Sequence, residues 1–305
     1  MTTKKVLVPV DFSPQQDVVL QQASVISKRL GAEIVLVHCA APPELSLVAV
    51  EPVYIPSTVM ERFTLDHSAA VAKKMNEVAQ VLRPEHTVEV VIKATGAVRG
   101  ILAVADEMDC DYIVMGSHGA GLDRFLLGSV AESVTRGATC PVIVARSESA
   151  SQFKRVVVGV DFSSFSLPLV QLAQALTLDE GESHLVHTWQ PPHLDTAHIF
   201  GDPGHDSFIG TINDGLKLHV LELQKCVSEL PADARFKLHV EMGRPAASLL
   251  AMVESLDADA IVVGAHDSDR IENFLGTVSD RILRHAGTTV LLTEQARAKR
   301  AGEKS

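Results

Sequence analysis

The chain has 305 residues, of which 46% are hydrophobic and 21% charged, and it carries a formal net charge of −11. This length accommodates two domains of ordinary size, and the composition excludes an intrinsically disordered chain. The acidic balance argues against non-specific nucleic-acid binding, which requires a basic face that displaces counterions from phosphates. Any bound phosphate must therefore be held locally, within one site.

The apolar run before Asp11 is too short for the core of a secretory signal, and no later segment approaches the length of a membrane span. We therefore expect a cytoplasmic protein with no membrane partner. The cysteines form no Cys-x-x-Cys pair and lie among apolar residues: Cys39, Cys110, Cys140 and Cys226. We expect them to be buried, reduced thiols rather than disulfides or zinc ligands.

Short apolar runs rich in Val and Ile alternate with helical patterns along the first half of the chain. The runs predict strands at about 5–10, 33–39, 87–93, 111–115 and 141–146. The segments between them predict helices at about 14–30, 57–83, 97–108 and 128–138. Strands that are almost continuously apolar and separated by helices are typical of a parallel sheet covered on both faces.

The second half repeats the first. Residues 6–13, Val-Leu-Val-Pro-Val-Asp-Phe-Ser, return at 156–163 as Val-Val-Val-Gly-Val-Asp-Phe-Ser, and Leu-Gly-Ser at 127–129 returns as Leu-Gly-Thr at 275–277. Strands follow at about 155–160, 183–188, 236–241, 259–263 and 288–293, and Pro168 suits the first turn of a helix. The chain is therefore expected to hold two tandem domains, 1–147 and 153–294.

A doubly wound sheet binds ligands at the carboxyl ends of its strands, where the strand order reverses. In the order 3-2-1-4-5, the loops after the first and fourth strands face one crevice. Asp11 is then placed to accept a donor from a base or sugar, while glycines and a helix start hold phosphates. The residues also allow plainer roles, because Ser129 and Glu132 match a capping box and Asp11 precedes a helix.

Several of these motifs together resemble the universal stress protein family over nearly the whole chain, as two domains in tandem. They are Gly116-Ser-His-Gly119, the spacing to Gly128-Ser129, the Val-Pro-Val-Asp-Phe-Ser opening, the Leu-Val-His turn and the Cys140-Pro-Val-Ile-Val strand. The resemblance implies a five-stranded α/β fold with strand order 3-2-1-4-5. Similar proteins pair their fifth strands antiparallel, so we expect the two halves to form an internal pseudo-dimer, with a homodimer as a further option.

In its ATP-binding members the family pattern is Gly-x2-Gly-x9-Gly-Ser/Thr, and this chain has eight residues between the second and third glycines. The match implies that phosphates lie along Gly116, His118, Gly119, Gly128, Ser129 and Val130. It places the adenosine near Pro9, Asp11 and Cys39.

The second copy departs further from this pattern. Asp267 replaces the second glycine, and Glu272 stands where the first copy has Arg124. Acids so close to a triphosphate require Mg²⁺ to offset the repulsion, so we expect this site to be lost or weakened. The residues that remain as binding candidates are Asp161, Gly264, Gly276 and Thr277.

Neither copy carries the lysine of a phosphate-binding Gly-x4-Gly-Lys-Ser/Thr loop, and no nucleophile stands beside an obvious base. We therefore expect slow ATP hydrolysis at most. Histidines gather in and around the loop of the second copy, at His184, His187, His193, His198 and His205. Their spacing matches no rigid metal-ligand frame, which favours one or two structural histidines over a divalent metal site.

The sequence thus predicts a cytoplasmic stress-response protein that binds ATP or a related adenine nucleotide with Mg²⁺, mainly in the first domain, in a regulatory or protective role. It names no protein partner. The alternative is a nucleotide-independent interaction protein whose clefts hold another small molecule or a divalent metal. An ATP-dependent ligase of a related α/β group comes third.

Overall fold

The computed structural model describes residues 3–40, 57–117, 127–146, 152–161, 166–189, 236–265 and 275–293, together with isolated helical positions between 215 and 225. Side chains at 57–64 are not included in this description. The chain divides into two compact units, Met1–Ala150 and Ser151–Ser305. The internal pseudo-dimer concerns the relation between these units and stays a prediction.

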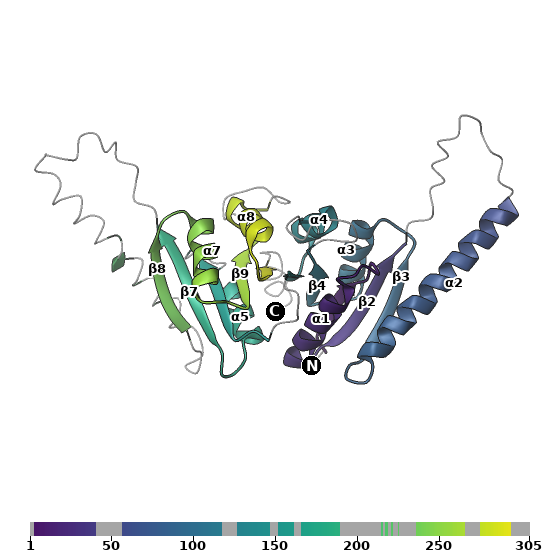
Figure 1. Cartoon of the computed structure of the whole chain (residues 1–305), viewed down its shortest axis with the longest axis horizontal. Helices are drawn as coiled ribbons and strands as arrows, with labels where there is room; N and C mark the ends of the chain where they lie inside the picture. The colour runs from purple at the N-terminus through teal and green to yellow at the C-terminus, as the bar shows by residue number, and fades with distance from the viewer. Residues whose placement is uncertain are drawn as a thin grey trace, which may run out of the picture. The chain divides into compact units, whose positions relative to one another are not determined.

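The first unit alternates strands and helices from end to end (Figure 1). Its elements are β1 (Lys5–Pro9), α1 (Gln16–Leu30), β2 (Glu33–Cys39), α2 (Ser57–Leu82), β3 (Val88–Lys93), α3 (Ala97–Glu107), β4 (Tyr112–Gly116), α4 (Ser129–Gly137) and β5 (Val142–Ala145). The strands lie in the order β3-β2-β1-β4-β5, and the pairs are parallel. The α/β fold with a parallel sheet is confirmed, and every predicted strand and helix of this copy is present.

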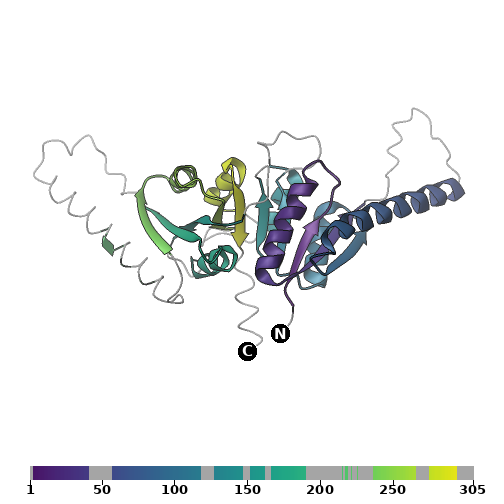
Figure 2. The same cartoon turned by 60° about the horizontal axis from the view of Figure 1, so that its bottom comes forward.

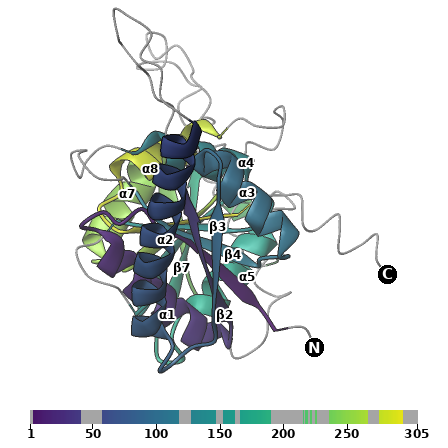
Figure 3. The same ribbon diagram turned by 90° about the vertical axis from the view of Figure 1, so that its right-hand side faces the viewer.

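Helices cover the sheet of the first unit with apolar stripes. α1 buries Val19, Ala23 and Ile26 and packs on β1 and β4, as its three- and four-residue spacing predicts. It ends at Gly31, whose φ of 61° is a left-handed conformation that favours glycine. α2 lies over β3 and β2, as Figure 3 shows, and α3 packs beside α4.

The second unit repeats the architecture (Figure 2). Its described elements are β6 (Arg155–Val160), α5 (Ser166–Leu176), β7 (Glu182–Trp189), β8 (Phe236–Met242), α7 (Pro245–Ser255), β9 (Ala260–Gly264), α8 (Thr277–His285) and β10 (Thr289–Thr293). They form a parallel sheet in the order β10-β9-β6-β7-β8. Pro168 lies in the first turn of α5, as predicted.

An aspartate before the fourth strand anchors each sheet at its amino end. Asp111 Oδ2 accepts a hydrogen bond from the backbone N–H of Lys5 at 2.9 Å. Asp259 Oδ2 accepts the backbone N–H groups of Lys154 and Arg155, each at 2.8 Å. The two units therefore fix the start of their first strand in the same way.

None of the three described cysteines is joined in a disulfide: Cys110 and Cys140 are buried, and Cys39 is half-buried. Cys226 lies outside the described residues. Cys39 lies directly beneath α3. A Cβ added at Gly100 would stand 2.4 Å from its Sγ. Glycine at this position therefore allows α3 to approach β2 closely.

Two histidines of the second unit, His184 and His187, form hydrogen bonds within the fold. His184 is 1% exposed, and its Nδ1 lies 3.0 Å from His239 Nε2, while its Nε2 lies 3.1 Å from Glu182 Oε1. His187 Nδ1 lies 2.9 Å from the carbonyl oxygen of Val160. His193, His198 and His205 lie outside the described residues.

The described part of the chain lacks two features, a metal-binding cluster and a membrane-spanning helix. It holds no group of three His, Cys, Asp or Glu side chains placed to share a metal ion. Its helices also include none that is both long and apolar enough to cross a bilayer.

Replacing Gly100 with alanine is expected to destabilise the first unit by about 1–3 kcal/mol, the usual cost of overpacking. The new methyl group meets the Cys39 sulfur, so Gly100→Ala combined with Cys39→Ala should recover much of the loss. Urea unfolding of the single and double variants measures both effects. A Gly100→Ala protein as stable as wild type would contradict the close contact.

The stability of the second unit is expected to fall as the pH drops below 6.5, the ordinary pKa of histidine. Burial lowers the pKa of His239, and the neighbouring His184 and Lys237 lower it further, against the opposing effect of Glu241. The unfolded chain therefore binds the proton more readily, and the stability present above pH 6.5 is lost as the pH falls.

Urea unfolding midpoints at pH 7.5 and pH 5 test this in wild type, in His239→Gln, and in His285→Gln as the control at an exposed histidine. The acid-induced drop should be smaller in His239→Gln than in the other two proteins. An equal drop in all three would contradict the assignment.

Candidate functional site

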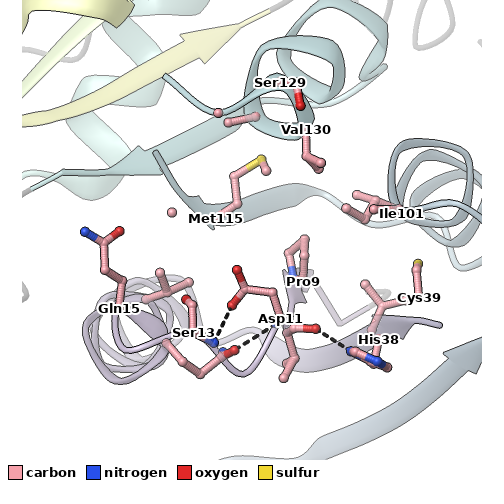
Figure 4. A pocket seen from close by; sticks show the side chains of 18 residues that line it. Pro9, Asp11, Ser13, Gln15, His38, Cys39, Ile101, Met115, Ser129 and Val130 are labelled. Carbon is pink, nitrogen blue, oxygen red and sulfur yellow. Dashed lines mark hydrogen bonds between the residues drawn. The ribbon is translucent and has the colours of Figure 1, made fainter. Parts of the chain in front are cut away.

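A cavity of about 440 Å³ opens at the carboxyl ends of β1, β2 and β4 in the first unit. Its walls come from the ends of these strands, the first turns of α1 and α3, and the start of α4 (Figure 4). In this view Cys39 and Ile101 lie at one end, Gln15 and Ser13 at the other, and Ser129 across from Asp11. The volume is in the range of small-molecule sites.

Most of the residues proposed from the sequence for the first copy line this cavity. They are Pro9, Asp11, Cys39, Gly116, Gly128, Ser129 and Val130. His118 and Gly119 lie outside the described residues. Further lining residues were not predicted from the sequence, among them Gln16, His38, Ile101 and Met115. For His38 the signal was present, because Leu-Val-His is repeated in the second copy.

One wall of the cavity is the start of α4. Gly128 is the N-cap residue, with an extended backbone (φ −69°, ψ 145°), and no side chain among the described residues caps the helix. Its N–H donates to the carbonyl oxygen of Ser117 at 2.7 Å. The first amides of a helix have no intrahelical acceptor, and the dipole places partial positive charge there. This wall therefore suits an anion or another acceptor.

The capping-box interpretation of Ser129 is wrong. The box requires the serine at the N-cap, but Ser129 is the first residue of the helix and Gly128 holds the cap. Glu132 pairs instead with Arg136 one turn along, at 2.5 Å. The side chain of Ser129 is exposed at the cavity, where it is open to a ligand.

The opposite wall is a tight turn after β1. Asp11 Oδ1 accepts the N–H of Ser13 at 2.9 Å, and Phe12 has a left-handed φ of 58°. Gln16 Oε1 accepts the N–H groups of Asp11 at 3.0 Å and Phe12 at 3.2 Å. Asp11 therefore closes this turn rather than capping α1, whose N-cap is Gln15.

His38 ties the end of β2 to this turn. Its Nδ1 lies 2.7 Å from the carbonyl oxygen of Val10, which can only accept, so Nδ1 carries the proton. The ring lies 4.7 Å from the ring of Phe12, centroid to centroid. Lys74, on α2, places its Nζ over the same Phe12 ring, 5.4 Å from the ring centroid. These contacts make His38 part of the scaffold of the cavity.

Cys39 contributes a neutral thiol to the wall. Burial raises the pKa of this thiol, and Lys93 offsets the effect only in part. A thiolate is the reactive form of cysteine, so a raised pKa disfavours a nucleophilic role. Cys39 is therefore a contact surface for an apolar or aromatic part of a ligand.

The second unit has a smaller cavity, of about 230 Å³, at the equivalent edge. Asp161, Gly264 and Gly276 line it, while Thr277 begins α8 and is exposed away from the lining. The Oγ of Ser279, which stands where the first copy has Ala131, donates to the carbonyl oxygen of Gly264. This hydrogen bond gives the Gly264 carbonyl oxygen, at the cavity, a partner from the same unit.

The turn of the second unit is also closed by its own side chains. Ser166 replaces Gln16, and its Oγ lies 3.3 Å from Asp161 N and 3.1 Å from Asp161 Oδ1. The acids at 267, 269 and 272 lie outside the described residues. The side chains of Asp161 and Ser279 at this cavity therefore have hydrogen-bond partners within the unit.

The chain matches the universal stress protein family twice, over residues 2–146 and 152–294. A universal stress protein of Mycolicibacterium smegmatis is 28% identical over 299 residues, covering 94% of this chain and 96% of that protein. One of Mycobacterium bovis is 32% identical over 199 residues, covering 62% of this chain and 63% of that protein's length.

Solved structures that cover nearly the whole chain agree with it in fold. A universal stress protein from Archaeoglobus fulgidus superposes with a TM-score of 0.68 at 21% identity, covering 97% of this chain and all of that one. Another universal stress protein, solved in complex with cAMP, covers 47% of this chain at 21% identity, with a TM-score of 0.31. Since the family model covers both halves, the chain belongs to the universal stress protein family and carries two of its domains in tandem.

Proposed function

We propose that the first domain, 1–147, binds ATP or a related adenine nucleotide, and that the chain serves as a nucleotide-responsive regulatory or protective protein of the stress response. The observation that carries this proposal is the pairing of two walls across one cavity of about 440 Å³. The start of α4 supplies amide donors, and the Asp11 turn supplies a carboxylate and a scaffold for a nucleoside.

The phosphates would lie against Gly116, Gly128, Ser129 and Val130. Backbone donors and a helix dipole hold an anion there without a basic patch, which suits a chain of net charge −11. The base and sugar would lie toward Asp11, Pro9 and Cys39. The neutral thiol and the apolar side chains of Ile101 and Met115 suit the faces of an aromatic ring.

Mg²⁺ is expected to arrive with the nucleotide. Asp11 is the single carboxylate in the described lining, and its Oδ1 already accepts the Ser13 N–H. Mg²⁺ is commonly held by substrate phosphates, water and one or two carboxylates, so this donor set fits a metal carried by ATP. When bound, the metal would neutralise phosphate charge.

The second domain, 153–294, is proposed to bind nucleotide weakly or not at all. Its cavity has about half the volume of the first, and Ser279 and Ser166 use its polar groups internally. In this proposal it contributes a second copy of the fold rather than a second equal site. The protein partner that would receive the nucleotide signal is a matter for experiment.

Wild-type protein is expected to bind Mg·ATP with about one strong site per chain. Calorimetry after removal of co-purified ligand, with ADP, AMP and cAMP as comparisons, measures the stoichiometry. At one hundred times the Kd, the ligand should stabilise the first unit by about 2.7 kcal/mol in thermal unfolding. Folded protein that gives no binding heat with any of the four would overturn the proposal, and two equal sites would overturn the account of the second domain.

Gly128→Val is expected to weaken nucleotide affinity at least about tenfold, because a branched side chain fills the space in front of the α4 amides. Gly276→Val is the matched control in the second unit, and it should leave the affinity unchanged. Both glycines have extended backbones that valine adopts without strain, with φ of −69° and −60°. Calorimetry of both variants decides, and equal losses would contradict the assignment to the first unit.

A further inference from the structure

The side chain of Gln16 is held in one orientation by the turn that it closes. Its Oε1 accepts the backbone N–H groups of Asp11 and Phe12, at 3.0 and 3.2 Å. Two donors facing the same atom require an oxygen, so the amide nitrogen must point the other way. The two backbone N–H groups therefore determine on which side of the amide Nε2 lies.

This nitrogen lacks an acceptor. Gln16 is 7% exposed, and within the described residues its Nε2 is buried without a hydrogen-bond partner. The same residue lines the cavity of the first unit. Buried donors are nearly always paired. Of the buried side-chain atoms that lack a partner within the described residues, the Gln16 nitrogen is the one whose residue lines a described cavity, so we look to a ligand for its acceptor.

The second unit has no such donor at this place. Ser166 stands at the equivalent position, and its hydroxyl both donates to Asp161 Oδ1 and accepts from Asp161 N. The shorter side chain thus closes the turn and leaves nothing over for a ligand. The unsatisfied donor occurs on the larger of the two described cavities.

The charge around Gln16 selects the part of the ligand that reaches it. The carboxylate of Asp11 lies in the same turn and repels phosphate, while the start of α4, which attracts phosphate, lies across the cavity at Ser129 (Figure 4). An uncharged acceptor is therefore favoured beside Gln16. On an adenine nucleotide such acceptors are the ring nitrogens and the ribose oxygens.

We infer that Gln16 is a specificity residue: its Nε2 donates a hydrogen bond to an uncharged acceptor on the nucleoside half of the ligand. This inference rests on the proposed nucleotide function and adds to it a residue that reads the base or the sugar. It also explains why the first cavity, and not the second, is suited to discriminate between nucleosides.

The test is a cycle between protein variants and ligand analogues. Calorimetry measures the Kd of ATP and of its 1-deaza, 3-deaza, 7-deaza, 2′-deoxy and 3′-deoxy analogues, each of which lacks one acceptor. Wild type should bind one of these about tenfold more weakly than ATP, as expected for a lost hydrogen bond at a buried site. Gln16→Ser should lose a similar factor toward ATP and lose nothing further with that analogue.

Gln16→Glu distinguishes the hydrogen bond to the ligand from the role of Gln16 in closing the turn. Its carboxylate still accepts both backbone N–H groups, so the turn stays closed, but it has no donor for the ligand. Its charge weakens every nucleotide alike, and the ratio of analogue to parent Kd removes that effect. This ratio should fall to about one in Gln16→Glu, as in Gln16→Ser. Gln80→Ser on the exposed side of α2 is the control and should keep the wild-type ratio.

Two results would count against the inference in different ways. If wild type and both Gln16 variants share the same ratios for every analogue, Gln16 does not read the ligand, although the nucleotide function stands. If folded wild type binds none of these ligands, the proposed function fails and the inference fails with it.

Discussion

One pairing constraint underlies the candidate site: β1 bonds in parallel to β2 on one side and to β4 on the other. Parallel strands end at the same edge of a sheet, so the segments after Pro9, Cys39 and Gly116 leave it together. If β4 instead lay beyond β3, three inter-strand spacings, about 14 Å, would separate the Asp11 turn from the start of α4. The cavity exists because this strand order brings the two walls together.

The strands and helices were predictable because burial leaves a period in the sequence. Asp11, Gly116 and Gly128 were predictable as lining residues because they stand at strand ends and at a helix start. The role of Gln16 was not, since it depends on a left-handed backbone at Phe12 that no periodicity records. The helix of Ser129 starts at the serine itself, and this one-residue difference defeats the capping box.

The two units show how few atoms change a cavity once the backbone is set. A hydroxyl at Ser279, where the first copy has the methyl group of Ala131, ties up the carbonyl of Gly264. Ser166 in place of Gln16 converts an open donor into a closed pair with Asp161. The strand order and the N–H bond at the N-cap glycine are the same in both units. The polar lining, rather than the fold, distinguishes them.

Both units keep the same histidine bond. His38 donates to the carbonyl of Val10, and His187 donates to that of Val160. Beside a candidate ligand site such a histidine suggests a catalytic role, yet the same bond in the second unit, with its smaller cavity, argues that the histidine supports the fold. The second unit thus serves as an internal comparison for the first, because a contact that both units keep belongs to the shared fold. Where the units differ, as at Gln16 and Ser166, the difference changes the cavity and leaves the sheet as it is.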